Sequence, residues 1–494
     1  MGSREVSTVD WQGKHVTVAG LGVSGIPAAR VLYGLGAVVT VVNDGDDERS
    51  RAQAAELESW AAARSASAEG GDGRGAGGIT VRLGDGATLP ESTELVVTTP
   101  GWRPDKPLFA AAAEAGVPVW GDVELAWRLR GPGAAPWLAV TGTNGKTTTV
   151  RMLASILEAA GLRTAAVGNI GVSLLDAVLG DEEYDVLAVE LSSYQLHWSP
   201  SLRAHSAAVL NLAPDHLDWH GSMEAYAADK GRIYEGSRVA CVYNAQERAT
   251  EDLVREADVE EGCRAIGFTL GTPGPSQLGV VDGILVDRAF VANRHKQAQE
   301  LAEVTDIDPP APHNIANALA AAALARAFGV EPAAVRDGLR AFHPDPHRIE
   351  HVADVAGVAY VDDSKATNTH ATEASLAAYE PIVWIAGGLA KGAAFDELVS
   401  GAAGRLRGVV LMGRDRALIR EALARHAPEV PVVDLDRTDT GAMSEAVREA
   451  ARLARPGDTV LLAPACASMD MFVNYNKRGE AFADAVRTLA AESD

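Results

Sequence analysis

A glycine-rich segment, Leu138–Val150, combines a lysine and several threonines in an order suited to phosphate binding. Its sequence is LAVTGTNGKTTTV, in which an apolar strand leads through Gly145 into a predicted helix. Backbone amides at the start of that helix, together with its positive end, can cradle phosphate oxygens. The Lys146 ammonium can reach β- and γ-phosphates, and the Thr147 hydroxyl can coordinate Mg²⁺. The segment departs from the usual phosphate-loop pattern, because Val140 stands where the first loop glycine is expected.

Two groups suited to a metal ion or a substrate follow in the same part of the chain. Glu190 comes directly after a predicted strand, Val186–Val189, which places its carboxylate at a carboxyl strand end beside the phosphate loop. A carboxylate in that position is suited to Mg²⁺. His216 stands in an Asp-His-x-Asp cluster, so we interpret it as a ligand of a metal or substrate instead of a structural histidine.

An asparagine pair marks a predicted helix, His313–Phe328, which Gly329 ends. Asn314 and Asn317 are one helical turn apart and therefore share a face. Asparagine is mildly unfavourable inside a helix. The pair therefore indicates a polar task on that face.

A second glycine loop stands near the N-terminus. Gly20, Gly22 and Gly25 form G-x-G-x-x-G between a predicted strand and a predicted helix, and Asp44 ends the next strand. Such glycines let backbone amides approach a pyrophosphate, and Asp44 could accept a hydrogen bond from a ribose or a base. The motif alone leaves NAD, FAD and a UDP-sugar open. A nicotinamide-dependent oxidoreductase is therefore one function to keep in view.

The elements that must position these groups alternate between short apolar strands and Ala-rich helices, which predicts an α/β protein with mostly parallel sheets. Its 494 residues predict three domains, at 1–131, 132–343 and 344–494. Residues 131–136 (GPGAAP) read as a linker, residues 343–347 (HPDPH) as a hinge, and Ala61–Gly78 as a flexible surface insertion. The predicted strands outside the central domain are His15–Ala19, Val38–Val42, Ile79–Leu83, Leu95–Thr98, Val117–Trp120, Ile382–Ala386, Val409–Met412, Val432–Leu435 and Thr459–Ala463.

Charge and composition narrow the functional class. There are 44 basic and 67 acidic residues, so the formal net charge is −23. Nucleic acid and anionic membranes would be repelled at long range, whereas a few local cations can still bind a small anion. The three cysteines lack metal spacing and are expected to be reduced thiols. Neither a signal peptide nor an apolar run of about 20 residues is evident, so we expect a cytoplasmic protein without membrane insertion.

The phosphate-loop variant TGTNGKTT resembles that of the Mur ligases and their relative folylpolyglutamate synthase. Further segments match the D-glutamate-adding branch of the Mur ligases, and the resemblance runs from about Gly20 to Gly479. The D-N-P-R motif usual in the branch that adds meso-diaminopimelate is absent from the sequence. The matching segments are ELSSYQ (190–195), NLAPDHLD (211–218), HNIAN (313–317), DDSKATN (362–368) and LAPACASMD (462–470).

The resemblance implies a fold and a reaction. The fold is a Rossmann-like N-terminal domain, a central ATPase domain with a phosphate loop and a Rossmann-like C-terminal domain. The implied reaction joins D-glutamate to UDP-N-acetylmuramoyl-L-alanine through an acyl phosphate, with ATP and two Mg²⁺ ions. It further implies that CO₂ carbamylates Lys230, which sequence spacing alone would leave as a surface lysine. A monomer is expected.

Residue roles are carried over from the same resemblance. The catalytic residues are Lys146, Glu190, His216 and Lys230, and the metal ligands are Thr147, Glu190, His216 and Lys230. The ATP site comprises Gly142, Thr143, Asn144, Gly145, Lys146, Thr147, Thr148, Asn314, Asn317, Arg348 and Asp363. The UDP-substrate site comprises Gly22, Val23, Ser24, Asp44, Thr99, Pro100, Gly101, Asn169, Ser192 and Gln195. The D-glutamate site comprises Lys365, Thr367, Lys391, Ser468, Met469 and Tyr475, of which Tyr475 replaces a phenylalanine of better-known relatives.

Two alternatives share the phosphate loop. Another Mur ligase or a folylpolyglutamate synthase would form the same acyl phosphate with a different acceptor, although the folate enzyme lacks the N-terminal glycine-loop domain. A binding protein regulated by ATP would use the loop without catalysis. The full set of candidate metal and substrate residues favours an enzyme.

Overall fold

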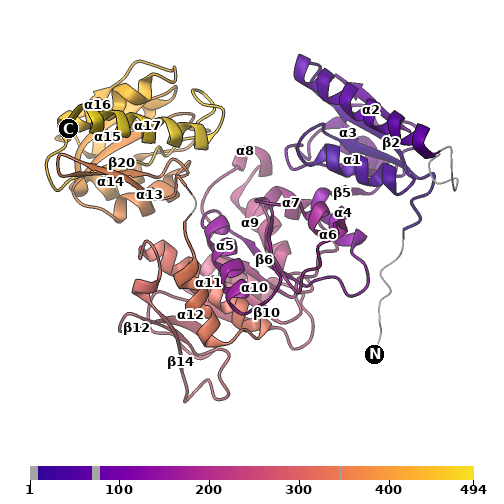
Figure 1. The fold of residues 1–494 in the computed structure, drawn as a ribbon, viewed down its shortest axis with the longest axis horizontal. Helices are drawn as coiled ribbons and strands as arrows, with labels where there is room; N and C mark the ends of the chain where they lie inside the picture. Colours follow the sequence, from indigo (N-terminus) through magenta and orange to yellow (C-terminus); the bar gives the residue numbers. More distant parts are fainter. Residues whose placement is uncertain (1–8, 69–77, 345, 494) are drawn as a thin grey trace. The chain divides into compact units, whose positions relative to one another are not determined.

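The computed structural model describes residues 9–68, 78–344 and 346–493, and these residues form an α/β fold with three separate β-sheets (Figure 1). The chain divides into two compact units. One contains the residues up to Asp306 together with Ile315–Ala341, and the other contains Ile307–Asn314 together with Phe342–Asp494. The predicted borders at residues 131 and 343 stay a prediction. No helix of the described residues is long and apolar enough to cross a membrane, and all three cysteines are free thiols.

The N-terminal sheet is parallel throughout, in the order β3-β2-β1-β4-β5. Its strands are short runs rich in valine, isoleucine and leucine, as expected for a sheet covered on both faces. Four of the five predicted strands have the predicted first residue, and β5 begins two residues later than predicted. The elements are β1 His15–Ala19, α1 Gly25–Gly34, β2 Val38–Asn43, α2 Glu48–Ala68, β3 Ile79–Leu83, β4 Leu95–Thr98, α3 Pro107–Glu114, β5 Val119–Gly121 and α4 Asp122–Leu129.

The prediction of a flexible insertion at Ala61–Gly78 is wrong for its first part. Helix α2 continues through Ala68. Ala61 is buried, and the Tyr33 hydroxyl donates to its carbonyl oxygen at 3.1 Å and lies 2.6 Å from the Ser65 hydroxyl. Alanine favours helix strongly, so this Ala-rich stretch extends the preceding helix. Residues 69–77 of the predicted insertion lie outside the described residues.

The central sheet has nine strands in the order β14-β13-β12-β11-β10-β9-β6-β8-β7. Six parallel pairings run from β7 to β12, and an antiparallel extension, β12-β13-β14, which the sequence did not predict, completes one edge. The strands are β6 Trp137–Thr141, β7 Ala166–Gly168, β8 Leu187–Glu190, β9 Ser206–Val209, β10 Ala240–Asn244, β11 Arg264–Phe268, β12 Gln277–Val281, β13 Ile284–Asp287 and β14 Gln299–Glu303.

Helices connect these strands and place the phosphate loop at the carboxyl end of β6, between the ends of β8 and β9. The predicted asparagine-bearing helix is present as α11 and ends before Gly329, whose φ is +96°. The helical elements are α5 Lys146–Ala159, α6 Leu174–Leu179, α7 Ser193–His197, α8 Leu217–His220, α9 Met223–Gly231, η1 Arg232–Tyr234, α10 Arg248–Glu256, η2 Val304–Asp306, α11 Pro312–Phe328 and α12 Pro332–Ala341.

The C-terminal sheet has the order β15-β16-β20-β17-β18-β19. Its four predicted strands are present and parallel, whereas the antiparallel pair β15–β16 at its edge was not predicted. The elements are β15 Glu350–Val355, β16 Val358–Asp362, α13 Thr369–Ala377, β17 Ile382–Gly387, α14 Asp396–Ala402, η3 Ala403–Arg405, β18 Leu406–Met412, α15 Arg416–His426, β19 Val432–Asp434, α16 Ala442–Leu453, β20 Thr459–Leu462 and α17 Tyr475–Ser493.

Close packing of α12 on α5 depends on Gly338. A β-carbon at Gly338 would lie 2.4 Å from the Ile156 α-carbon, and the Ser155 hydroxyl donates to the Gly338 carbonyl oxygen at 2.7 Å. We predict that Gly338→Ala lowers the free energy of unfolding by about 1 to 3 kcal/mol, because the helices must separate. The control is Gly34→Ala, at an exposed helical position with no atom near its β-carbon, which should stabilise by up to about 1 kcal/mol. Urea unfolding measures both, and equal effects would contradict the packing explanation.

Candidate active site

Glycine is required where the phosphate loop turns into α5. Gly145 caps the helix with a φ of +81°, in the left-handed region that side chains rarely adopt. A β-carbon there would also lie 2.3 Å from Oδ1 of Asn317. The loop and the middle of α11 are thus in direct contact through the two residues. Thr147 and Thr148, both largely buried, occupy the first turn of α5.

Asn211, at the carboxyl end of β9, holds the loop in shape. Its carbonyl oxygen accepts from the Thr143 amide at 3.0 Å. Its side chain accepts from the Asn144 amide at 2.8 Å and donates to the Asn144 carbonyl oxygen at 3.1 Å. The Thr143 hydroxyl makes further hydrogen bonds with Ala213 and Tyr226. Asn211 was not among the predicted site residues; its position at a strand end inside a matching motif was the available signal.

Two lysines share one acceptor beneath the loop. Lys146 Nζ donates to the Gly142 carbonyl oxygen at 2.9 Å and to that of Thr143 at 2.8 Å. Lys230 Nζ donates to the same Gly142 oxygen at 2.7 Å. Lys230 is 2% exposed. Sequence spacing alone would have made it a surface lysine, which is wrong. Burial, followed by the neighbouring Lys146 charge, holds the Lys230 pKa well below its usual value.

Glu190 supplies an unsatisfied carboxylate oxygen at the end of β8. Glu190 is 2% exposed, and its Oε1 accepts a hydrogen bond from the Asn169 side-chain amide at 2.9 Å. Oε2 is buried without a hydrogen-bond partner. A buried carboxylate oxygen of this kind is costly unless a cation binds it. The charge of Glu190 also acts on Lys230, so the two predicted catalytic residues are neighbours. The position therefore fits a metal ligand.

His216 directly precedes the short helix α8 and has a φ of 54°, an unusual backbone conformation for a residue other than glycine. Its Nε2 lies 3.5 Å from a carboxylate oxygen of Asp215, and its ring packs 4.9 Å from the Tyr194 ring. Such backbone strain is often found at functional sites. Within the described residues, however, Glu190, Asp215 and His216 do not form a compact group of three metal-ligand atoms.

A pocket of about 380 Å³ collects several residues of the predicted UDP-substrate site. Val23, Ser24 and Pro100 come from loops that follow strands of the N-terminal sheet, whereas Asn169 directly follows β7 of the central sheet and Gln195 lies in α7. Gly22, Thr99 and Gly101 belong to the same N-terminal loops. The structure thus brings together residues from two predicted domains.

Asp122 lines this pocket, whereas Ser192 and Asp44 do not. Asp122, which was not predicted, lines it, and burial raises the pKa of its carboxyl group. Ser192 forms a capping box with Gln195 at the start of α7, so both residues also have a structural role. Asp44 does not line the pocket and pairs with the Lys106 ammonium.

In the other compact unit, Asp363 lies at the end of β16 next to Arg348. Asp363 is largely buried, which raises the pKa of its carboxyl group to about 6, while the Ser375 hydroxyl and the Arg348 charge oppose that rise. Asn314 lies in the same unit and donates from its side chain to the Pro309 carbonyl oxygen at 3.2 Å. Arg348 and Asp363 are therefore neighbours, as a shared site requires.

The residues of the predicted D-glutamate site lie on four segments, which are the loops after β16, β17 and β20 and the start of α17. Lys365 Nζ stands 4.1 Å from the centroid of the Tyr475 ring, at the start of α17. Lys391 and Ser468 lie on two loops that are joined by reciprocal backbone hydrogen bonds between Leu389 and Ala467, at 2.9 and 3.0 Å. Met469 is largely exposed, Ser468 is buried, and Thr367 lies in the loop after β16.

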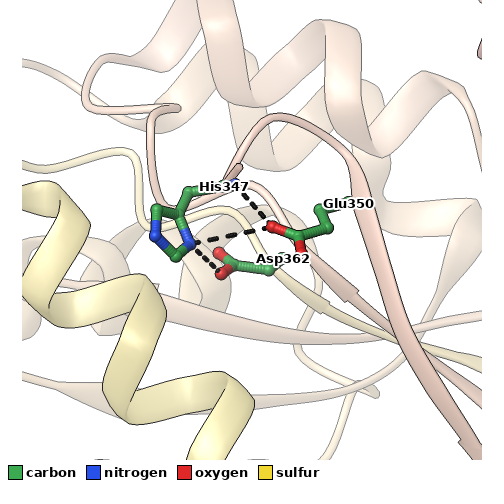
Figure 2. A group of neighbouring side chains, drawn as sticks. All are labelled: His347, Glu350 and Asp362. Carbon is green, nitrogen blue, oxygen red and sulfur yellow. Dashed lines mark hydrogen bonds and ion pairs between the residues drawn. The ribbon is translucent and has the colours of Figure 1, made fainter. Parts of the chain in front are cut away.

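His347, Glu350 and Asp362 form the one group of three possible metal ligands within the described residues (Figure 2). His347 Nδ1 donates to Asp362 at 2.7 Å, and the His347 amide donates to Glu350 at 2.8 Å. The hydrogen bond to Asp362 raises the His347 pKa, which favours the imidazolium over the neutral ring that a metal requires. The group therefore fits an ion pair better than a metal site.

Comparison with known proteins agrees with this geometry. The Mur ligase middle domain matches residues 140–325, and the Mur ligase, glutamate ligase domain matches residues 347–466. A protein of Streptomyces avermitilis is 84% identical over 98% of this chain and 100% of its own length. A protein of Thermobifida fusca is 58% identical over 98% of this chain and 100% of its own length. The chain belongs to the Mur ligase family. Both of these relatives carry the name UDP-N-acetylmuramoylalanine–D-glutamate ligase.

A solved structure shares the fold. The MurF ligase from Thermotoga maritima, in complex with ADP, is 16% identical, with a TM-score of 0.56 over 98% of this chain and 96% of its own. Together with the mostly parallel sheets, this likeness confirms the predicted α/β fold class, with its central domain built around a phosphate loop.

The pair His347–Asp362 should make stability depend on pH. Because the pKa of folded His347 is raised, the pair contributes fully below the ordinary histidine pKa of about 6.5 and is lost as pH rises through the higher value. We predict that the wild type loses stability above about pH 6.5 relative to His347→Gln, which has no titrating group there. Urea unfolding followed by ¹⁹F NMR of fluorinated Trp384, the one tryptophan of residues 342–494, measures this. Parallel pH profiles for the two proteins would contradict it.

Proposed function

We propose that this protein is an ATP-dependent ligase that joins D-glutamate to UDP-N-acetylmuramoyl-L-alanine in peptidoglycan precursor synthesis. Full-length similarity to relatives of that name carries the proposal. The paired lysines under the phosphate loop and the unsatisfied Glu190 oxygen are what such a reaction needs. A carboxylate does not condense with an amine in neutral water, so ATP must activate it.

The reaction has two chemical steps. The L-alanine carboxylate oxygen attacks the γ-phosphorus, the bond to the β-phosphate oxygen breaks, and ADP leaves. The nitrogen of D-glutamate then attacks the acyl phosphate carbon, and inorganic phosphate leaves as the amide forms and the amine loses its proton. Lys146 neutralises the transferring phosphoryl group, and the amides of Gly145, Lys146 and Thr147 bind its oxygens.

Bound Mg²⁺ would neutralise phosphate charge, and two ions are proposed. Thr147, Glu190, His216 and carbamylated Lys230 would hold them. The unpartnered Glu190 oxygen supports this assignment. For His216, the strained backbone is the supporting feature. Asn314, Asn317, Arg348 and Asp363 are proposed to bind the rest of the nucleotide, and the contact of Gly145 with Asn317 supports that role for the asparagine.

The substrate sites follow the same logic. We propose that the UDP-sugar occupies the pocket of Val23, Ser24, Pro100, Asn169 and Gln195, with Gly22, Thr99, Gly101, Asp44 and Ser192 at its margins. D-Glutamate would bind Lys365, Thr367, Lys391, Ser468, Met469 and Tyr475. The ammonium groups of Lys365 and Lys391 would pair with its two carboxylates. The protein would act as a cytoplasmic monomer of three domains, at 1–131, 132–343 and 344–494, that close about residues 343–347 and exclude water from the acyl phosphate.

Phosphate release from Mg-ATP and UDP-N-acetylmuramoyl-L-alanine tests the function. We expect release with D-glutamate but not with L-glutamate or meso-diaminopimelate, and one new amide product. Lys146→Ala should lower the rate by about 10³-fold through lost stabilisation of the phosphoryl charge, whereas the exposed Lys296→Ala should not change it. Release with another acceptor would assign the chain to a different ligase of the family. Undiminished ligation by Lys146→Ala would refute the role of the phosphate loop.

Carbamylation of Lys230 has its own test. A neutral amine attacks CO₂ to form a carbamate and release a proton, and the lowered pKa of this buried lysine favours the neutral amine. The carbamate would place a negative charge close to the Gly142 carbonyl oxygen and to Glu190. A cation beside Glu190 would balance that charge. We predict one ¹³C NMR carbamate resonance from protein equilibrated with ¹³C-bicarbonate and Mg²⁺, lost in Lys230→Ala and retained in Lys296→Ala. A spectrum unchanged by Lys230→Ala would contradict the assignment.

A further inference from the structure

Arg478 is a buried arginine to which the proposed reaction gives no role. It lies in the first turn of α17 and is 1% exposed. Burial lowers its pKa to about 10, so the guanidinium remains charged at neutral pH. By contrast, Arg487 of the same helix is exposed and pairs with Asp484. A buried charge with five donors is costly unless those donors are satisfied.

The guanidinium bonds two loops at once. Its Nε donates to the Ser364 hydroxyl at 3.0 Å, and its Nη2 donates to the Ser364 carbonyl oxygen at 2.8 Å. Its Nη1 donates to the Cys466 carbonyl oxygen at 3.0 Å. One planar group therefore fixes the loop after β16 against the loop after β20. The acceptors are backbone and hydroxyl oxygens, which points to a bracing role for the arginine.

Both loops carry residues of the proposed D-glutamate site. Lys365 directly follows Ser364, and Ser468 comes two residues after Cys466. The Ser364 hydroxyl also donates to the Tyr475 carbonyl oxygen at 2.8 Å, and the Tyr475 ring lies under the Lys365 ammonium. The Arg478 network thus joins the segments that present Lys365, Ser468 and Tyr475.

We propose that Arg478 is a positioning residue for the D-glutamate carboxylates, which sets the spacing between Lys365 and Ser468. The inference rests on the proposed function, because it assumes that these residues bind the amino acid. Lysine cannot replace the arginine, since its single ammonium lacks the planar fork that reaches both Ser364 and Cys466. Loss of the planar guanidinium lets the two loops separate. A misplacement of the binding groups by about 1 Å can lower activity by about a hundredfold.

Steady-state kinetics of Arg478→Lys and Arg478→Met test the inference. We expect KM for D-glutamate to rise by about a hundredfold, while KM for the UDP-sugar substrate stays within about twofold because its pocket is elsewhere in the chain. Ser364→Ala removes one acceptor and should raise KM for D-glutamate by a smaller factor. Added guanidinium ion should partly restore a low KM in Arg478→Ala, which a purely structural defect would not show. Arg487→Met is the matched control and should match the wild type.

The outcomes separate the inference from the function on which it rests. Wild-type turnover with D-glutamate tests the function alone. If the wild type is active, then folded Arg478→Lys and Ser364→Ala variants with an unchanged KM for D-glutamate would overturn the positioning role. A fall in kcat with no change in any KM, or the absence of rescue by guanidinium, would overturn it as well. Should Arg478→Met fail to fold, the lysine and Ser364 variants still decide the question.

Discussion

The carbonyl oxygen of Gly142 accepts hydrogen bonds from both Lys146 and Lys230, so this one oxygen links the start of α5 to the end of α9. Burial, followed by the neighbouring Lys146 charge, disfavours the charged form of Lys230 and lowers its pKa. Under the proposed function, phosphate would bind at Lys146 and a carbamate would form on Lys230. Glu190, whose Oε2 has no hydrogen-bond partner, would then offer a carboxylate oxygen to a cation.

In the C-terminal unit, a buried arginine side chain, Arg478, holds two loops together. Its site loops after β16 and β20 are braced by one buried guanidinium, which uses neutral oxygens as partners. His347 is held by a charged partner, Asp362, which is the last residue of β16. Under the proposed function, such bracing would suit the recognition of two carboxylates at a set spacing, because affinity for each carboxylate would fall if the loops moved. The phosphate loop, in contrast, is shaped by hydrogen bonds between its backbone and both the side chain and the carbonyl oxygen of Asn211.

In both units, the candidate site residues gather at the carboxyl ends of parallel strands. Gly142 follows β6, Glu190 ends β8 and Asp363 follows β16. Strand ends place loops from distant parts of the chain at one edge of a sheet, so a family can change its substrate through loops while the sheets remain. The distant likeness to the MurF ligase at 16% identity is consistent with this, because the sheets persist where most side chains differ.

Sequence by itself determined the nine predicted strands of the N-terminal and C-terminal sheets, helix α11 and the glycine loop before α5, because these depend on residue preferences and spacings among near neighbours. It did not predict the edge strands β12–β14 and β15–β16, where polar stretches such as Gln299–Glu303 lack the strong apolar pattern of central strands. It also misread Ala61–Ala68 as flexible. Only the tertiary structure decided that Lys230 is buried against Gly142, that a Glu190 oxygen is left unpartnered and that Arg478 joins two loops. The physical reason is that burial and charge pairing depend on groups far apart in the chain, 88 positions for Lys230 and Gly142, which no local pattern records.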